Sequence, residues 1–129
     1  MGRPQYNTRK DSTSHKEVFN WLANHNCHPL SLSKSVPFYR GGYIQGYPLF
    51  AADISNIGGW VDWLIWIGDP GKHISCAWEC KEPGSEKMLT YGEAAWKERG
   101  PTLFYIIVDQ DDCDMAAKDA IEHLRGNPM

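Results

Sequence analysis

The sequence contains no apolar segment long enough to cross a bilayer, which takes about 20 consecutive apolar residues in a helix. It also lacks the signal-peptide pattern of a basic start, an apolar centre and a small-residue cleavage site. A chain of 129 residues can bury a core without disulfides, and 42% hydrophobic and 22% charged residues are ordinary proportions for a globular protein. We therefore expect one cytoplasmic domain.

Cysteine is scarce and does not follow the spacing of a metal-binding motif. The chain has four cysteines and no CxxC pair among them. The segment His25-Asn26-Cys27-His28 offers metal ligands, but a zinc site needs a matching second half, which the sequence does not supply. We interpret this segment as the end of a helix, and the cysteines as reduced, packed thiols.

A strong basic excess, the usual mark of a general nucleic-acid binder, is absent, because the net charge is −3. The charge is uneven, however: residues 1–52 carry a net +4 and the remainder a net −7. A positive first part could follow a phosphate backbone while the acidic remainder collects metal ions. A solvated surface of mixed charge is the alternative.

The polar, basic start of the chain predicts a flexible arm over residues 1–13, followed by a single domain over residues 14–129. Ser14 and Glu17 have the spacing of a capping box, and apolar residues follow at helical spacing. This pattern predicts a first helix over residues 15–26.

After the first helix the apolar residues no longer follow a regular spacing. We expect a short strand at residues 29–33 and then a long loop over residues 34–59, a length that usually indicates function. Arg40 lies there among aromatic side chains, a composition suited to nucleic acid. The candidate DNA-binding residues are Lys34, Tyr39, Arg40 and Tyr43 in this loop, and Arg9, Lys10 and Lys16 before it. The alternative is a hydrophobic cluster that covers one edge of a sheet.

Two strands joined by a tight turn form the centre of the predicted fold. Residues 61–68 are almost continuously apolar, which predicts a strand covered on both faces. Asp69-Pro70-Gly71-Lys72 has the composition of a turn. The next strand, residues 73–81, alternates, so Glu79 and Lys81 share one face and Cys80 lies on the other.

The rest of the chain predicts helix, strand and helix. A second capping box at Thr90 predicts a helix that ends after Trp96, and residues 102–108 read as a third buried strand. Asp111, Asp112 or Asp114 is expected to begin a last helix. The fold class is therefore α/β, with a mixed central sheet and an additional C-terminal helix.

Asp62, Glu79 and Lys81 are charged residues in segments that otherwise look built for burial, where charge is costly unless it is paired or bound to a metal. Asp62 and Glu79 could face each other across the two strands, with Cβ atoms roughly 4.5–5.5 Å apart. Two carboxylates so close repel unless they share a proton or a cation. The pair therefore predicts a Mg²⁺ or Mn²⁺ site, to which the backbone carbonyl of Cys80 could add a ligand.

Lys81 completes this group, since it emerges on the same face as Glu79 and within reach of whatever the metal binds. A lysine in this place can orient or deprotonate an attacking water and offset charge in the transition state. The combination suits hydrolysis of a phosphodiester. His15, with its neighbours Lys16 and Arg9, could touch phosphate, but we place it on a solvated face of the first helix.

The order of these motifs resembles a known family. Gly59-Trp60-Val61-Asp62, then sixteen residues, then Glu79-Cys80-Lys81, then Thr90 with Glu93 and Trp96, is similar to the PD-(D/E)XK nuclease superfamily and most like its small VRR-NUC nucleases. The resemblance covers about residues 14–110. It implies a restriction-endonuclease-like αβββαβ core, and a homodimeric, Mg²⁺- or Mn²⁺-dependent DNA endonuclease that acts on branched DNA such as four-way junctions.

The resemblance also implies roles for single residues. Asp62 and Glu79 would be metal ligands and Lys81 the catalytic lysine, while Glu17 matches an acidic residue of the first helix that could contact a second metal. Two departures from the family pattern are Val61, where relatives carry proline, and Glu93, where they carry glutamine. Glu93 could strengthen metal binding or cap its helix.

Alternatives remain open for these residues and for the function. Glu17 could serve only in the capping box, and Asp62 could form a structural ion pair with Lys81. A nuclease fold that no longer cuts could bind nucleic acid or a partner protein. A sequence-specific endonuclease of restriction, homing or repair type would keep the chemistry and change the substrate.

Overall fold

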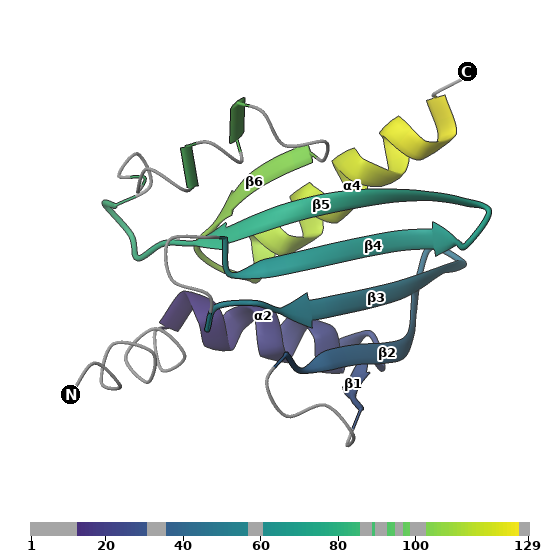
Figure 1. Cartoon of the computed structure of the whole chain (residues 1–129), viewed down its shortest axis with the longest axis horizontal. Coiled ribbons are helices and arrows are strands. Elements are labelled where there is room, and N and C mark those ends of the chain that lie inside the picture. The colour runs from purple at the N-terminus through teal and green to yellow at the C-terminus, as the bar shows by residue number, and fades with distance from the viewer. Residues whose placement is uncertain are drawn as a thin grey trace.

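The computed structural model describes residues 13–30, 36–56, 61–85, 89, 93–94, 97–98 and 103–126. The architecture is a six-stranded mixed sheet with two helices packed on one of its faces (Figure 1). The helices are α2 (Thr13–Asn24) and α4 (Gln110–Gly126). The strands are β1 (His28–Pro29), β2 (Phe38–Ile44), β3 (Tyr47–Asp53), β4 (Trp63–Asp69), β5 (Lys72–Cys80) and β6 (Leu103–Ile107).

The strands lie in the order in which they occur along the chain, and each neighbouring pair is antiparallel except β5 and β6, which are parallel. A parallel pair requires the chain to return to the other end of the sheet, and the helical residues 93–94 and 97–98 lie in this connection. The predicted α/β class with a mixed central sheet is therefore confirmed. The predicted helix from Thr90 to Trp96 falls partly outside the described residues.

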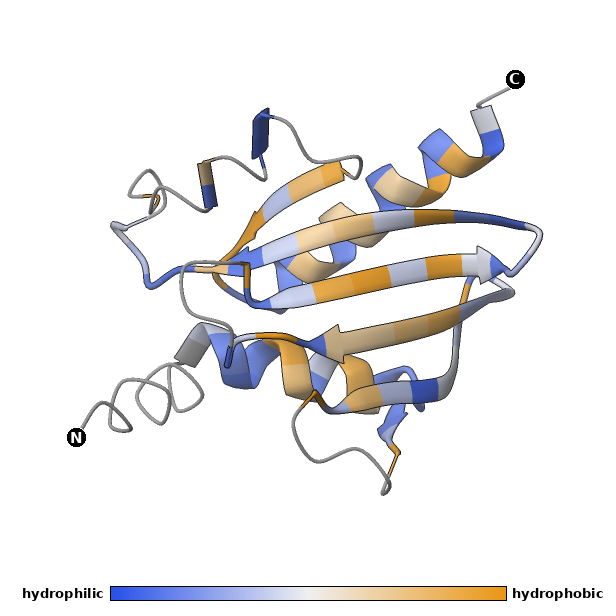
Figure 2. Cartoon of the chain, viewed as in Figure 1, coloured by the Kyte–Doolittle hydropathy of each residue, from blue (hydrophilic) through white to orange (hydrophobic). Residues whose placement is uncertain are grey.

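The β4–β5 hairpin forms where the sequence predicted it. Asp69 pairs with Lys72, which leaves Pro70 and Gly71 as a two-residue turn. Along β4 the residues at 63, 65 and 67 are fully buried and those at 64 and 66 are half-buried, so the two faces are not equally covered. Figure 2 shows that β4 is mainly orange with pale intervals, whereas the start of β5, beyond the turn, is blue. The prediction of a strand covered on both faces is thus correct for one face and only partly correct for the other.

The prediction of a long loop over residues 34–59 is wrong, because β2 and β3 form a second hairpin within it. Gln45 and Gly46 make the turn with φ values of 51° and 85°, the left-handed pair that a type I′ turn requires. The pairing shifts register between Tyr39 and Gly42. This irregularity interrupts the alternation of polar and apolar residues, which is why the sequence pattern suggested a loop.

Gly42 has a packing role at this irregularity. A Cβ atom there would lie 2.4 Å from the carbonyl oxygen of His25 and 2.9 Å from the Cβ of Cys27. Only a residue without a side chain lets β2 pass so close to the end of α2. This close approach fixes the first helix against the sheet edge.

The segment after α2 is a helix end, as predicted. Asn26 has a φ of 62°, and the N–H of Cys27 donates to the carbonyl of Leu22 while that of Asn26 donates to Ala23, which is the Schellman arrangement. The Cys27 thiol donates to the carbonyl of Leu49, and burial raises its pKa to about 11 against a smaller lowering by a backbone hydrogen bond from Gly42. All four cysteines are free thiols.

Two predicted helix starts need correction. Thr13 is already helical and Ser14 is buried, so Ser14 is not the cap of α2. In α4, Asp109 is the cap, since its carboxylate accepts from the N–H of Asp112. Asp114 instead accepts from the indole N–H of Trp21 at 2.8 Å and thereby joins the two helices.

The main core lies between the helices and one face of the sheet. It is built from an apolar stripe on each helix and from strand residues that include Trp63 and Trp78, both fully buried. A smaller cluster on the opposite face comprises Ala52, Ile54, Val61 and Ala77, with Leu64 and Trp66 packed against it. Within the described ranges, neither helix has the length and apolar character needed to span a membrane.

Candidate active site

Three acidic residues gather at one end of the sheet. Asp53 ends β3, Asp62 immediately precedes β4, and Glu79 is the penultimate residue of β5. These strands are neighbours, and Asp53 pairs with Trp63, which in turn pairs with Trp78. The three carboxylates are 1%, 2% and 1% exposed. Burial of three acids at one place requires compensating donors or cations.

Glu79, Lys81 and Glu93 form one group, named here the lysine cluster. The Lys81 ammonium lies 3.5 Å from Oε2 of Glu79 and donates a hydrogen bond to Oε1 of Glu93 at 3.1 Å. The Glu79 and Glu93 side chains are buried, and that of Lys81 is 14% exposed. The ion pairs of Lys81 are therefore with these two glutamates and not with Asp62. Glu93, which the sequence left between two roles, joins the predicted site.

Asp62 lies beside the same segment of β5. The paired register of β4 and β5 ends with Trp63 opposite Trp78, so Asp62 and Glu79 are the next residues of the two segments. That their carboxylates face each other stays a prediction, since the Asp62 carboxylate lies beside His15 and Cys80. Its Oδ2 accepts a hydrogen bond of 2.9 Å from the backbone N–H of Cys80, the residue between Glu79 and Lys81. The chain bends at Asp62 before β4 begins. This bond fixes the carboxylate at the end of β5.

The prediction that His15 lies on a solvated face is wrong. Its side chain is fully buried, and its ring lies 5.1 Å from that of Phe19 and 5.0 Å from that of Trp63. Nε2 of His15 is 3.2 Å from Oδ2 of Asp53. His15 has the spacing of the apolar stripe that continues at Val18 and Leu22, so its inward direction was readable from the helical period.

Asp53 is held by donors on two sides. Its Oδ1 accepts from the hydroxyl of Ser55 at 2.6 Å and from the N–H of Ser55 at 3.0 Å, while Oδ2 faces His15. Burial raises the pKa of this carboxyl, but the hydrogen bonds and charge of His15 and the bonds from Ser55 together lower it below its ordinary value of 3.8. The missed β2–β3 hairpin explains why the sequence did not single out Asp53.

His15, Asp62 and Cys80 bring a nitrogen, an oxygen and a sulfur close together. One ligand atom from each lies within 4.8 Å of the other two. Together with Asp53, which contacts His15, these residues are named the histidine cluster. Glu17, the acid of the first helix that the resemblance selected, is half-buried. Burial raises the pKa of the Cys113 thiol on α4 most, and the charges of Asp114, Asp112, Asp109 and, last, Glu17 raise it further. His15 is the α2 residue that reaches the Asp62 carboxylate.

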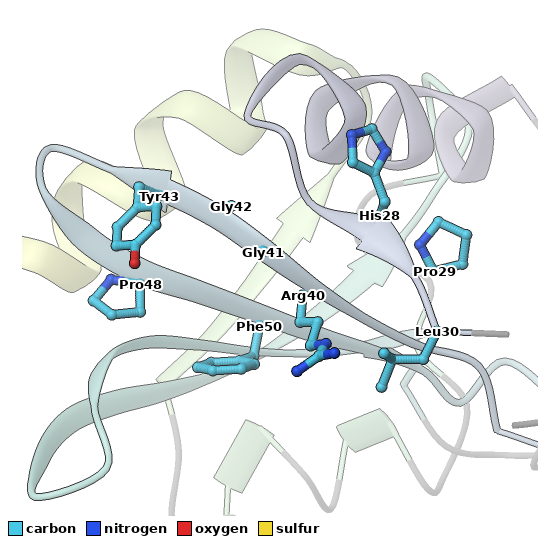
Figure 3. A pocket seen from close by; sticks show the side chains of 9 residues that line it. All are labelled: His28, Pro29, Leu30, Arg40, Gly41, Gly42, Tyr43, Pro48 and Phe50. Atoms are coloured by element: carbon cyan, nitrogen blue, oxygen red, sulfur yellow. The ribbon is translucent and has the colours of Figure 1, made fainter. Parts of the chain in front are cut away.

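Three of the candidate DNA-binding residues, Tyr39, Arg40 and Tyr43, lie on β2 and differ in what they contact. Arg40 and Tyr43 line a pocket of about 520 Å³ with Phe50 and Pro48 (Figure 3), and Tyr43 is 62% exposed. Tyr39 instead packs in the core against Phe19 and Trp63, so it is not available for stacking on a base. Lys16 is exposed on α2. Arg9, Lys10 and Lys34 lie outside the described residues.

Comparisons with protein-family models, with curated proteins and with solved structures found no match to this chain. The case for a function therefore rests on the side chains at the end of β5.

Proposed function

We propose that this protein is a metal-dependent DNA endonuclease that hydrolyses phosphodiester bonds at the end of the sheet where β4 begins and β5 ends. One observation carries the proposal. Glu79 and Lys81, chosen from the sequence for a shared face, lie 3.5 Å apart, and the Asp62 carboxylate is bonded to the N–H of the residue between them. The Glu79–Lys81 contact and the bond from Cys80 to Asp62 support the assignment of these three residues as the catalytic set.

The fold is consistent with this proposal. The described chain runs from a helix through the antiparallel strands β3, β4 and β5, then through a connection with helical residues to β6, parallel to β5. Strands β1 and β2 come before β3, so an αβββαβ core of the kind that the resemblance implies would take α2, β3, β4, β5, the helical residues of the connection and β6, with β1 and β2 as additions. We extend the proposal to a restriction-endonuclease-like core and a homodimer that acts on branched DNA.

Lys81 is the group that would act on the substrate. Its ammonium is anchored by Glu93 at 3.1 Å and retains further donors, since an ammonium has three. One donor can hydrogen-bond a non-bridging phosphate oxygen and offset the charge that develops there. In its neutral form the same nitrogen can accept a proton from the attacking water. The partial exposure of Lys81 gives a phosphate access to this end of the sheet.

The carboxylates of Asp62 and Glu79 are donors of the type that a hard divalent cation prefers. Asp62 and Glu79 would hold Mg²⁺ or Mn²⁺ through carboxylate oxygens, the ligands that these ions prefer, with the Cys80 carbonyl as a further oxygen. When bound, such an ion supplies Lewis-acid polarisation of the phosphate. Glu93 places an additional negative charge beside Lys81. Its contribution would be to hold the ammonium in position.

Cleavage by single-residue variants tests the proposal. Purified protein is incubated with linear, nicked, flapped and four-way junction DNA in Mg²⁺ or Mn²⁺. Glu79→Gln and Lys81→Met should lower cleavage by about 10²–10⁴-fold, the usual contribution of a group that assists proton transfer. Glu82→Gln and Lys72→Met are matched controls, because both side chains are exposed and belong to the same segment. Undiminished cleavage by Glu79→Gln and Lys81→Met would refute the assignment.

A protein that binds DNA without cutting it is the second candidate. The observation that favours it is the burial of Glu79 and Glu93, which are 1% and 0% exposed and both lie beside the Lys81 ammonium. This alternative predicts no cleavage of any substrate in the panel. DNA affinity would persist in Glu79→Gln and fall steeply with salt.

A further inference from the structure

We propose that His15, Asp62 and Cys80 form a site for a borderline-soft divalent metal of the Zn²⁺ or Co²⁺ class. The site shares Asp62 with the proposed Asp62–Glu79 pair and differs from it in using His15 and Cys80. It does not depend on the nuclease proposal. The closeness of the three ligand atoms, within 4.8 Å of one another, is the observation that carries it.

The distances suit coordination after a small adjustment. Ligands at roughly 2.0–2.3 Å from a tetrahedral Zn²⁺ stand about 3.3–3.8 Å apart. Atoms that now lie within 4.8 Å would move by about 1 Å or less to reach that spacing. Cys80 is at the end of its strand and half-buried, so its side chain has room to make this movement. The fourth position would remain for water or another ligand, as in catalytic zinc sites.

Asp53 is placed to orient the histidine. The 3.2 Å contact with the Asp53 carboxylate is made by Nε2 of His15, and a proton there would leave the lone pair on Nδ1, which we assign as the metal ligand. A carboxylate behind a ligating histidine fixes its tautomer and its ring. Ser55 holds Asp53 in turn through two hydrogen bonds. The rings of Phe19 and Trp63 restrict rotation of the imidazole from the sides.

Asp62 and Cys80 are held together before any metal binds. The backbone N–H of Cys80 donates to Oδ2 of Asp62 at 2.9 Å, and a carboxylate has about four lone-pair positions, so capacity for a metal remains. A neutral imidazole, a carboxylate and a thiolate sum to a charge of −2. A divalent cation neutralises that charge in a buried place, which is the condition for holding it there.

The ligand types decide which metal class the site would take. Mg²⁺ prefers oxygen ligands and octahedral geometry, and it binds thiolate and imidazole poorly. Nitrogen and sulfur donors favour Zn²⁺, Co²⁺ and related ions. The histidine cluster would therefore be filled by Zn²⁺ or Co²⁺ in the presence of a large excess of Mg²⁺.

Cobalt absorption tests the site without any activity measurement. Metal-free full-length protein is titrated with Co²⁺, and the thiolate-to-cobalt charge-transfer band in the near ultraviolet is recorded. We expect one equivalent to bind with this band, Zn²⁺ to remove it, and Mg²⁺ to leave it unchanged. Cys80→Ser should abolish the band. Asp53→Asn should weaken Co²⁺ binding about 10- to 100-fold without removing a ligand.

Cys27→Ser is the matched control. Cys27 is a buried thiol whose hydrogen bond to Leu49 a serine hydroxyl can also make, and it belongs to the His25–His28 segment that offers rival ligands. The band should survive in this variant. Absence of the band in the wild type, its survival in Cys80→Ser, or its loss in Cys27→Ser would each overturn the inference. Cleavage in Mg²⁺ is measured separately with Glu79→Gln, so the two proposals fail independently.

Discussion

The lysine cluster and the histidine cluster occupy the same end of the sheet but differ in chemistry. The lysine cluster has two carboxylates on one ammonium, with Nζ–O distances of 3.1 and 3.5 Å. The histidine cluster has imidazole, thiol and carboxylate groups, with the His15–Asp53 contact at 3.2 Å. The first offers only oxygen to a metal, whereas the second offers nitrogen and sulfur as well.

Alternation along β5 produces this difference. Trp78 and Cys80 share the face that packs against the helices, while Ala77 and Glu79 share the opposite face. The consecutive residues Glu79 and Cys80 therefore lie on opposite faces of the sheet, Glu79 in the lysine cluster and Cys80 in the histidine cluster. Asp62, which precedes β4 in a bend, contacts the backbone between them. A single strand end can thus carry two sites with different metal preferences.

Removal of the Lys81 ammonium from the lysine cluster should have the largest effect on the free energy of unfolding. Lys81→Met leaves the buried Glu79 and Glu93 without the ammonium between them, and we expect a loss of about 3–5 kcal/mol in the free energy of unfolding. Lys72→Met, at the exposed start of β5, should change it by less than about 0.5 kcal/mol. Denaturant melts measure both. Equal stabilities of the two variants would show that the lysine cluster is not an electrostatic unit.

A double variant sharpens the same comparison. Adding Glu93→Gln to Lys81→Met removes one buried negative charge, so part of the lost stability should return. Glu98→Gln, an exposed glutamate of the same connection, should restore none. Recovery in both double variants would contradict a specific Lys81–Glu93 pair.

The histidine cluster should respond to acid through Asp53. Its pKa is lowered in the folded protein, so its contribution is fully present above the ordinary value of 3.8 and is lost as the pH falls through the lower, folded pKa. Asp53→Asn should lose about 1–3 kcal/mol near neutral pH, because His15 and Ser55 lose a charged acceptor. The stability of the variant should then depend less on pH below 3.8 than that of the wild type. Denaturant melts of both proteins across this pH range measure the difference. Parallel curves of unfolding free energy against pH would exclude the His15–Asp53 pair.

The pocket beside β2 lies outside both clusters and should affect only binding. Tyr43 is 62% exposed, so Tyr43→Ala should leave the free energy of unfolding unchanged. If its ring stacks on a base, DNA affinity should fall about fivefold, or about 1 kcal/mol. Fluorescence anisotropy with labelled junction DNA measures this affinity. If Tyr43→Ala loses stability and keeps its DNA affinity, the Tyr43 ring contributes to packing and not to DNA binding.

The sequence predicted the β4–β5 hairpin well because its turn residues and its alternation agree. Asp62, Glu79 and Lys81 were selected for their charge within an apolar strand pair, and the structure brings Glu79 within 3.5 Å of Lys81 and bonds Asp62 to the N–H of Cys80. The β2–β3 hairpin was missed because Gln45-Gly46 is a weak turn signal and the shift near Gly42 breaks the period. Because this hairpin was not predicted, the sequence assigned no neighbouring residue to Asp53.

His15 was misplaced for a related reason. Its basic neighbours Lys16 and Arg9 suggested either contact with phosphate or a solvated face, whereas the helical period directs it toward Trp63 and Asp53. Contacts between residues 38 positions apart, such as His15 with Asp53, depend on how the helix lies against the sheet. Local pattern does not determine that arrangement, so the histidine cluster could only be recognised in three dimensions.

The most direct test of the central claim is single-turnover cleavage of a four-way junction in Mg²⁺ by Glu79→Gln beside Glu82→Gln. Both substitutions remove one carboxylate charge, but only Glu79 is buried next to Lys81. The account predicts that Glu82→Gln cuts at the wild-type rate and that Glu79→Gln is slower by about 10²-fold or more. Equal rates in the two variants would contradict it.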